Sequence, residues 1–305
     1  MEKLVSVVYY AFFISVGAAM GSFANVAIYR LPRNMSVNNP TRSFCPFCGN
    51  KILWFDNIPL VSYILLRAKC RFCKAPISFR YFLVEALSSF CFLICAYHFH
   101  PPGNKPPDMT SFFLALSASA FSLALIICSF IDAAHKIIPD VIDIPGIFAG
   151  VGLSFLLPNL QQDTEPVKAL FRLIFAENRF SPWLDTRLIA LSSSIIGAAT
   201  GAVVILIVAI LGKKIFKREA MGFGDVKYLA MIGAFLGFKF VLIAFVIACL
   251  VGTVVGLPIL ISGKKYHEIP FGPFLSLGGF VMLIWGGKVA YFVLELYPRW
   301  VMGES

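Results

Sequence analysis

Apolar segments long enough to cross a membrane constrain this fold more than any other feature of the sequence. Hydrophobic residues make up 59% of the 305 positions, and charged residues only 14%. A soluble core of this size cannot bury so much apolar surface. The sequence therefore predicts an all-α polytopic membrane protein with about eight transmembrane helices, each long enough for a hydrocarbon layer of roughly 30 Å.

Seven apolar runs supply the eight predicted helices. Five runs are single helices: residues 4–29, 81–99, 110–131, 141–157 and 188–211. A sixth run, residues 228–261, would be about 51 Å long as one helix, too long for a single crossing without extreme tilt. We expect this run to divide at the sequence GFK, residues 237–239, into a short sixth helix and a full seventh. Residues 271–287 are the eighth.

Most of the 26 Lys and Arg residues lie in four connections between these helices. The connections are residues 30–80, Lys136, residues 213–227 and residues 264–265. Because basic connections stay on the cytoplasmic side, we expect them inside and both termini outside. The net charge of +10 then reflects topology and attraction to anionic membrane lipid, and nucleic acid is not an expected partner.

Two CxxC pairs stand in residues 30–80, the only sizeable connection that we expect to be soluble. Cys45 and Cys48 form the first pair, and Cys70 and Cys73 form the second. Two such pairs can place four thiolates around one zinc ion, whereas disulfides are disfavoured in a reducing cytoplasm. A four-cysteine site is closed to water, so we expect one structural zinc that staples a connection too small for a core of its own.

Two aspartates lie where predicted helices meet the cytoplasmic side. Asp132 follows the run 110–131, and Asp225 begins the sixth helix within the sequence MGFGDVK. Carboxylates beside hydrocarbon are costly and are commonly functional. The helix dipole disfavours a carboxylate at a C-terminal end and favours one at an N-terminal end, so the two groups can share one proton. Such a pair predicts aspartic peptidase chemistry, in which one carboxyl group activates water and the other protonates the substrate.

Other polar positions near this pair also invite a functional interpretation. Two glycines, Gly222 and Gly224, come just before Asp225 and would let an extended substrate backbone approach closely. Glu85 lies inside the second predicted helix, so it is expected to be paired, protonated or part of a ligand site. Structural roles are the alternatives, with Asp225 capping its helix and Asp132 lying in an interfacial loop.

The combined motifs resemble those of the bacterial prepilin peptidases, also called type IV leader peptidases. The shared segments are GSFANV at residues 21–26, WFDNIP at 54–59, IPD at 138–140, GFGDVK at 222–227 and PFGPF at 270–274. With the two CxxC pairs, the resemblance covers nearly the whole chain. The chain departs from the usual pattern at Phe55, Ala68 and Phe82, and none of these changes removes a reactive group.

The resemblance implies a bifunctional intramembrane enzyme. It would remove the leader of type IV prepilins and pseudopilins at the cytoplasmic face of the bacterial inner membrane, with Asp132 and Asp225 as the catalytic pair. It would then N-methylate the new terminus with S-adenosylmethionine. In this family the cysteine-bearing connection is associated with methylation. The resemblance therefore implies that the four cysteines are metal ligands. Glu85 is the acid that we would assign to the methyl-donor site.

The predicted organisation has three parts. Residues 1–29 form the first transmembrane helix, residues 30–80 the zinc-binding connection, and residues 81–305 the transmembrane peptidase core. Two other classes of function remain open. One is a transporter that relays protons or cations through Asp132 and Asp225. The other is a non-catalytic membrane scaffold that holds a partner with its zinc-bearing connection.

Overall fold

The computed structural model describes residues 2–39, 42–102, 107–165, 167–169, 181–217, 221–261 and 269–302. Regular structure in these residues is helical, apart from two isolated β-bridges between the first two long helices. The all-α class predicted from the sequence is thereby confirmed. The chain divides into two compact units, Met1–Ile131 (unit 1) and Asp132–Ser305 (unit 2), and the boundary falls inside helix α4 (Met109–His135).

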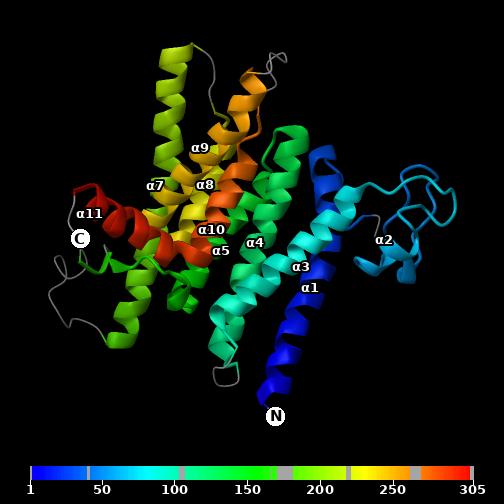
Figure 1. The fold of residues 1–305 in the computed structure, drawn as a ribbon, viewed down its shortest axis with the longest axis horizontal. Coiled ribbons are helices and arrows are strands. Elements are labelled where there is room, and N and C mark those ends of the chain that lie inside the picture. Colours follow the sequence, from blue (N-terminus) through cyan, green and yellow to red (C-terminus); the bar gives the residue numbers. More distant parts are fainter. Residues whose placement is uncertain are drawn as a thin grey trace. The chain divides into compact units, whose positions relative to one another are not determined.

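Unit 1 is built on two long helices, α1 (Glu2–Arg30) and α3 (Phe79–Phe99), which lie side by side (Figure 1). The connection between them holds three short helical elements. These are the 3-10 turns η1 (Leu31–Arg33) and η2 (Trp54–Asn57) and the helix α2 (Val61–Leu65).

Small residues let α1 and α3 pack closely. A Cβ atom on Gly17 would lie 2.7 Å from Ser89 Cα, and one on Gly21 would lie 2.7 Å from Glu85 Cα. Side chains longer than hydrogen would push the two backbones apart, which is why small residues mark helix crossings in membranes. The close crossing holds Glu85 against α1, at the end of α3 that faces the cysteine-bearing connection.

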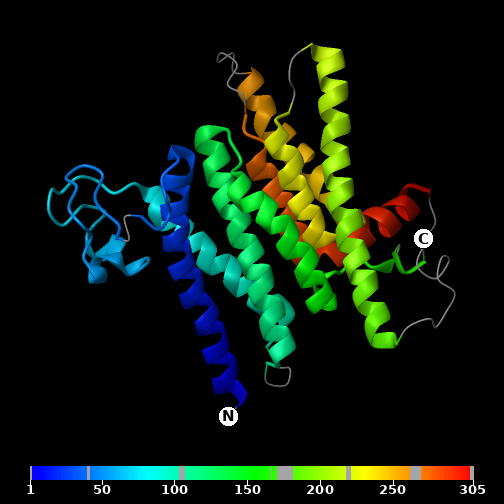
Figure 2. The same cartoon turned by 180° about the vertical axis from the view of Figure 1, so that it is seen from behind.

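Unit 2 surrounds one short buried helix, α8 (Phe223–Leu236), in which every residue from Tyr228 to Leu236 is buried. The helices α5 (Asp140–Leu156), α7 (Pro182–Phe216), α9 (Phe238–Ile261) and α10 (Gly272–Tyr291) pack against it. Figure 2 shows α7, in yellow-green, running along α8, in yellow. At 14 residues, α8 is about 21 Å long, so Asp225 near its start lies within a helix too short for a full crossing.

Glycines bring α7 and α8 into backbone contact. A Cβ atom on Gly197 would lie 2.2 Å from the carbonyl oxygen of Gly233, and one on Gly233 would lie 2.1 Å from that of Gly197. A Cβ on Gly201 would meet the carbonyl oxygen of Leu229 at 2.3 Å. No larger residue fits at these positions, so the crossing fixes α8 along its length.

The break predicted at residues 237–239 is confirmed and lies at Gly237, because α8 ends at Leu236 and α9 begins at Phe238. Gly237 has a φ of 82°, a conformation that glycine adopts without strain. The Asp163 carboxylate accepts the N–H of Lys239 at 2.6 Å and so caps the start of α9. The side chain of Gln161 donates to the carbonyl oxygen of Ala234 at 2.7 Å. The segment after the turn η3 (Pro158–Leu160) therefore closes the α8–α9 junction.

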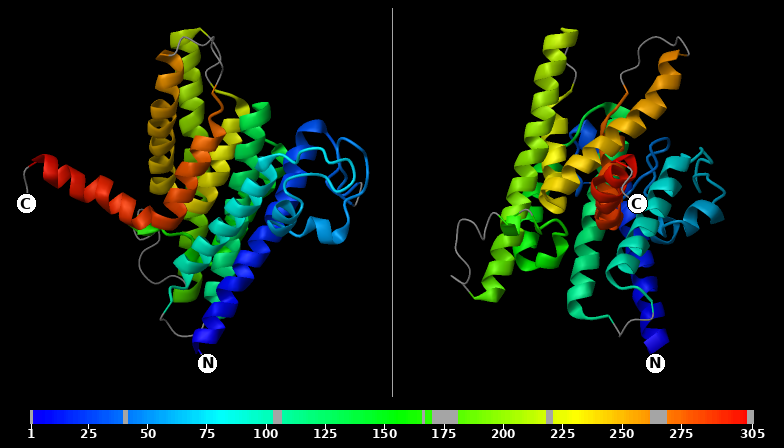
Figure 3. Two further views of the ribbon diagram at one scale, coloured as in Figure 1. Left: turned by 45° about the vertical axis from the view of Figure 1, so that its right-hand side comes forward. Right: turned by 60° about the vertical axis from the view of Figure 1, so that its left-hand side comes forward.

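The last helices of unit 2 leave its packed part. After α10 the chain forms a π-helical turn, η4 (Phe292–Leu296), and then α11 (Tyr297–Met302). In the left panel of Figure 3 this red segment points away from α7, α8 and α9. Its aromatic side chains Phe292 and Tyr297 are exposed.

Within the described residues, six helices are long and apolar enough to cross a membrane: α1, α3, α4, α7, α9 and α10. The other two predicted helices also form, as α5 and α8, with 17 and 14 residues. A multi-pass membrane protein is thus confirmed by length and composition. Three of the basic residues used for orientation, Arg218, Lys264 and Lys265, lie outside the described residues. The division into residues 1–29, 30–80 and 81–305 stays a prediction.

Candidate functional site

Asp132 lies in the last turn of α4, and only 6% of the residue is exposed. Its Oδ2 atom accepts the N–H of Gly272, the first residue of α10, at 2.7 Å. A Cβ atom at position 272 would lie 2.7 Å from that oxygen, so only glycine lets the backbone donate here. The start of α10 thereby fixes one oxygen of a buried carboxyl group.

Asp225 is the third residue of α8, and its Oδ2 atom accepts the N–H of Gly222 at 3.1 Å. It thus caps its own helix, as one alternative from the sequence proposed. The carboxyl group is half-buried, and the charge of Asp132 acts on it. The two aspartates, 93 positions apart (132 and 225), therefore belong to one electrostatic neighbourhood within unit 2.

The glycines before Asp225 are not required by the packing of the chain itself. Gly222 has an extended backbone with a φ of −80°, which any residue adopts. A Cβ atom there would come no closer than 3.8 Å to another atom, and one on Gly224 no closer than 3.4 Å, to Ile138. These are ordinary contacts, so neither position requires glycine to avoid a clash within the chain.

An ion pair near these glycines joins α8 to α5. The Lys227 ammonium group binds the Asp140 carboxylate, linking α8 to the first residue of α5. The same ammonium group lies 5.4 Å from the centre of the Phe223 ring. The sequence alone did not predict this pair. The available signal was that Asp140 begins its helix and Lys227 lies near the start of its own, each inside one of the motif segments IPD and GFGDVK.

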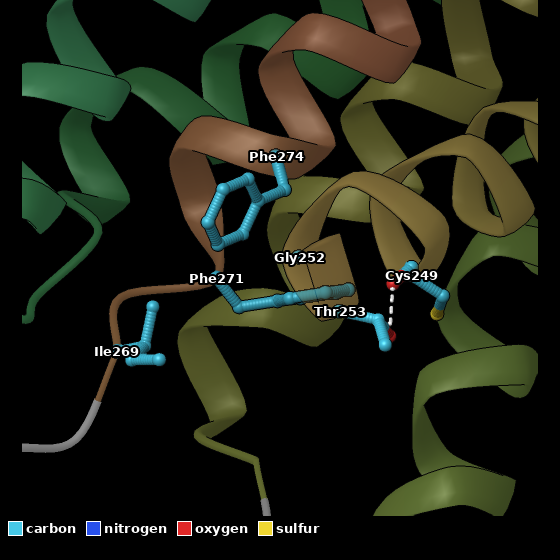
Figure 4. Close-up of a pocket in the computed structure, with 6 residues that line it drawn as sticks. All are labelled: Cys249, Gly252, Thr253, Ile269, Phe271 and Phe274. Carbon is cyan, nitrogen blue, oxygen red and sulfur yellow. Dashed lines mark hydrogen bonds between the residues drawn. The ribbon is translucent and has the colours of Figure 1, made fainter. Parts of the chain in front are cut away.

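A small cavity of about 280 Å³ opens beside the start of α10, between that helix and α9 (Figure 4). Phe271 and Phe274 line it from the α10 side, and Gly252 lines it from α9. Phe271 directly precedes Gly272, whose N–H binds Asp132. One residue that lines the cavity is therefore the direct neighbour, in the sequence, of the residue that binds the buried carboxyl group.

The four predicted zinc ligands are brought together in unit 1. Their sulfur atoms all lie within 4.8 Å of one another, and Cys45 Sγ is 3.8 Å from Cys73 Sγ. Ligands at about 2.3 Å from a tetrahedral zinc ion stand about 3.8 Å apart. The geometry and the chemistry of four thiols both fit zinc, so Cys45, Cys48, Cys70 and Cys73 form a candidate metal centre.

The two halves of this centre repeat one backbone design. Cys45 N donates to Asn50 O and Gly49 N donates to Cys45 O. In the second half Cys70 N donates to Ala75 O and Lys74 N donates to Cys70 O. The backbone N–H groups of Cys73 and Phe72 lower the pKa of the Cys70 thiol to about 7. Although the N–H of Ala75 acts in the opposite direction, burial and the neighbouring thiols raise the pKa of Cys73 to about 11, so Cys70 is the thiol that ionises more readily of the two.

A salt bridge holds the second half against the turn η2. Arg71 binds Asp56 with two bonds of 2.6 Å each, in the bidentate geometry that guanidinium and carboxylate groups favour. This bond is also the main reason that the pKa of Asp56 is lowered. Residues near the metal centre are thereby tied to a segment that lies between the two CxxC pairs.

Glu85 is paired within unit 1. Its Oε2 atom accepts the N–H of Leu60 at 2.7 Å, and the Ser22 hydroxyl group also bonds to its carboxylate. Glu85 therefore connects α1, α3 and the segment that precedes α2. It lines a larger cavity that also reaches Cys45 and Cys70.

Comparison with known proteins supplies two matches to family models. Residues 15–99 match the bacterial peptidase A24 N-terminal domain, and residues 119–257 match the type IV leader peptidase family. The two matched regions contain the CxxC pairs and the two aspartates, respectively. No solved structure matches the chain.

Three curated relatives named prepilin leader peptidase/N-methyltransferase are similar to this chain. The protein of Dichelobacter nodosus is 32% identical over 307 residues, which cover 91% of this chain and 92% of the relative. The protein of Pseudomonas aeruginosa is 30% identical, with 92% of each chain covered. The protein of Myxococcus xanthus is 34% identical over 251 residues, and the match spans 82% of this chain but 63% of that relative.

Proposed function

The chain belongs to the type IV leader peptidase family, and we propose on this premise that it is an intramembrane aspartic endopeptidase that removes the leader of type IV prepilins and pseudopilins. One observation carries the assignment of the catalytic pair. Asp132 and Asp225 lie in one unit, and each carboxylate accepts a backbone N–H from a glycine, Gly272 or Gly222. Fixed carboxyl groups that sense each other's charge are suited to holding one proton between them.

Hydrolysis then needs only these two groups and water. One carboxyl group is ionised and takes a proton from water, whose oxygen attacks the carbonyl carbon of the scissile peptide bond. The other is protonated and gives its proton to the carbonyl oxygen. When the tetrahedral intermediate collapses, the C–N bond breaks and the first carboxyl group gives its proton to the leaving amine. The second carboxyl group takes a proton back from a hydroxyl group of the intermediate as the C=O bond re-forms. Both carboxyl groups end in their starting states.

The substrate approaches along the open backbone before Asp225. Neither a positive φ nor neighbouring atoms require glycine at positions 222 and 224. Glycine at these positions lets the backbone of a substrate strand approach closely. The cavity lined by Phe271 and Phe274 lies one residue from Gly272 and accepts an apolar side chain of the substrate.

The second half of the proposed function is N-methylation of the terminus that cleavage exposes, with S-adenosylmethionine as the donor. The name shared by the curated relatives supports it. When bound, S-adenosylmethionine supplies an electrophilic methyl group. Zinc at the four cysteines would have a structural role, because four thiolates leave no open coordination position for water.

We assign the enzyme to the bacterial inner membrane, with both termini outside and the aspartates near the cytoplasmic face. The distribution of basic residues supports this orientation. A prepilin has a basic leader followed by an apolar helix, so its scissile bond waits at the same interface.

Cleavage by purified full-length protein tests the peptidase. Wild type is incubated with a prepilin beside Asp132→Asn and Asp225→Asn, which keep the shape but lose the titratable group. We expect a loss of more than about 100-fold in each variant. Asp108→Asn is the matched control, because Asp108 directly precedes α4 and caps it through the N–H of Ser111, a bond that asparagine keeps. Full cleavage by either active-site variant, or none by wild type, refutes the assignment.

A further inference from the structure

The short helix α2 of unit 1 has its apolar side outward. Its outward face consists of Val61, Ile64 and Leu65, which share one side of the helix and are 48%, 64% and 76% exposed. Ser62 is the residue that the helix buries, and its hydroxyl group donates to the carbonyl oxygen of Phe55 at 3.1 Å. A helix at the surface of a water-soluble domain has the reverse pattern, with polar residues outward. The outward face of α2 therefore suits an apolar environment.

A hydrogen bond places α2 at the level of the membrane surface. Helix α3 has 21 residues, so it is about 31 Å long and its whole length is needed to cross a hydrocarbon layer of roughly 30 Å. Phe79, its first residue, then lies at the boundary of this layer, and Glu85 lies about 9 Å further in. The Glu85 carboxylate accepts the N–H of Leu60, the residue before α2, at 2.7 Å. Because a glutamate side chain is shorter than that depth, the start of α2 is held at the boundary.

The surface of α2 also adjoins the lipid-facing side of α3. Exposed apolar residues recur along α3 at intervals of three or four, at Phe79, Leu83, Leu87 and Phe90. This spacing forms one stripe along the helix, as expected for a face that meets lipid. The ring of Tyr63 in α2 lies 6.5 Å from that of Phe79. The stripe of α3 thus ends beside α2, at a cluster of aromatic rings of the kind that marks a membrane–water interface.

The connection that contains α2 is strongly basic. Residues 30–80 hold nine Lys and Arg residues and one acidic residue, Asp56, which is bound by Arg71. Three basic residues follow α2 and are exposed: Arg67, Lys69 and Lys74. Apolar side chains next to Lys and Arg are the pattern by which segments bind membranes that contain anionic lipid. The same charge disfavours the basic leader of a prepilin as the molecule that covers α2.

We propose that α2 is an interfacial helix. Its outward face inserts among the lipids of the leaflet that α3 enters, and the three basic residues after it bind the phosphate groups of anionic lipid headgroups. The bilayer thereby holds the cysteine-bearing connection at a third point, besides its two ends at α1 and α3. The inference rests on the proposed orientation only for the identity of the leaflet, which is the cytoplasmic one.

Tryptophan fluorescence tests the insertion without relying on activity. Full-length Leu65→Trp protein is reconstituted in vesicles of phosphatidylcholine and the anionic lipid phosphatidylglycerol. Subtraction of the wild-type spectrum leaves the signal of the added tryptophan. We expect lipids with brominated acyl chains to quench this signal by about twofold or more, and acrylamide dissolved in the water to quench it little. Phe90→Trp, in the stripe of α3, is the reference for a tryptophan in hydrocarbon, and Ile64→Trp repeats the measurement on the outward face.

Charge variants test the part played by the basic residues. Replacing Arg67, Lys69 and Lys74 together by glutamine in the Leu65→Trp protein should abolish the difference in lipid quenching between vesicles with and without phosphatidylglycerol. Replacing Lys213 and Lys214, in the last turn of α7, by glutamine is the matched control and should preserve that difference. Zinc content of each variant checks that the connection is folded.

The outcomes are separable from those of the peptidase test. Strong quenching by acrylamide and none by brominated lipid, at both positions 64 and 65, overturns the insertion and indicates a surface for a protein partner. Equal lipid quenching with and without phosphatidylglycerol in the Leu65→Trp protein overturns the part played by the basic residues. Prepilin cleavage by wild type in the same vesicles tests the proposed function by itself, because both aspartates lie in unit 2.

Discussion

The N–H of Gly272 donates to Oδ2 of Asp132 at 2.7 Å, although the two residues are 140 positions apart in the chain. Gly272 begins α10 and Asp132 lies in the last turn of α4, so the bond joins the ends of two long helices. Backbone donors at a helix N-terminus stabilise negative charge. The start of α10 therefore orients the carboxyl group of Asp132.

Gly272→Ala is expected to reduce prepilin cleavage by about 100-fold, because the added Cβ would lie 2.7 Å from Asp132 Oδ2 and must displace the carboxyl group. Gly287→Ala is the matched control in the same helix, since a Cβ there meets no atom within 4 Å. Initial rates of cleavage and thermal unfolding are measured for both variants. Equal cleavage by the two variants would show that the position of Asp132 does not limit the reaction.

Gly222→Ala and Gly224→Ala are expected to fold normally and to cleave poorly. Their own surroundings accept a Cβ, with nearest atoms at 3.8 Å and 3.4 Å, so thermal unfolding should change little. If a substrate strand lies against this backbone, the methyl group obstructs it and KM rises by about tenfold or more, since even about 1.4 kcal/mol of lost binding gives that factor. Wild-type kinetics in both variants would contradict the proposed approach of the substrate.

The sequence predicted those parts of the molecule that depend on local patterns of residues. The apolar runs predicted the long helices, the excessive length of residues 228–261 predicted a break at residues 237–239, and the CxxC spacing predicted the cluster of four sulfur atoms. Each of these follows from the length or spacing of neighbouring residues, which a single sequence displays.

Contacts between segments far apart in the sequence could not be predicted, because no local pattern of residues records them. Nothing near Asp163 indicates that its carboxylate caps α9 at Lys239, and nothing near Gly272 indicates that its N–H binds Asp132. Such contacts depend on how helices cross, and crossings are fixed by three-dimensional packing of small residues such as Gly197 against Gly233. The catalytic roles of the aspartates stay predictions that only the cleavage experiments test.

Cys70→Ser is expected to remove most of the zinc, which we predict at about one ion per chain. Metal content is measured by elemental analysis of purified protein. Cys91→Ala is the control, because Cys91 is buried in α3 and is not part of the four-sulfur cluster. Zinc-depleted protein should still cut prepilin, because both aspartates lie in unit 2 and the four cysteines in unit 1. Wild type without zinc would refute the metal centre.

Asp163→Ala is expected to destabilise unit 2 by about 1–3 kcal/mol, because the N–H of Lys239 would lose its only carboxylate acceptor at the start of α9. Asp163→Asn keeps an oxygen in place and should cost less. Asp185→Ala is the control for loss of an acidic side chain, since it lies in the first turn of α7, outside the α8–α9 junction. Thermal unfolding in one detergent compares the three variants. Asp225 is the third residue of α8, and α8 ends at this junction, so Asp163→Ala should also lower the cleavage rate. A variant as stable and active as wild type would show that the cap has no part in positioning α8.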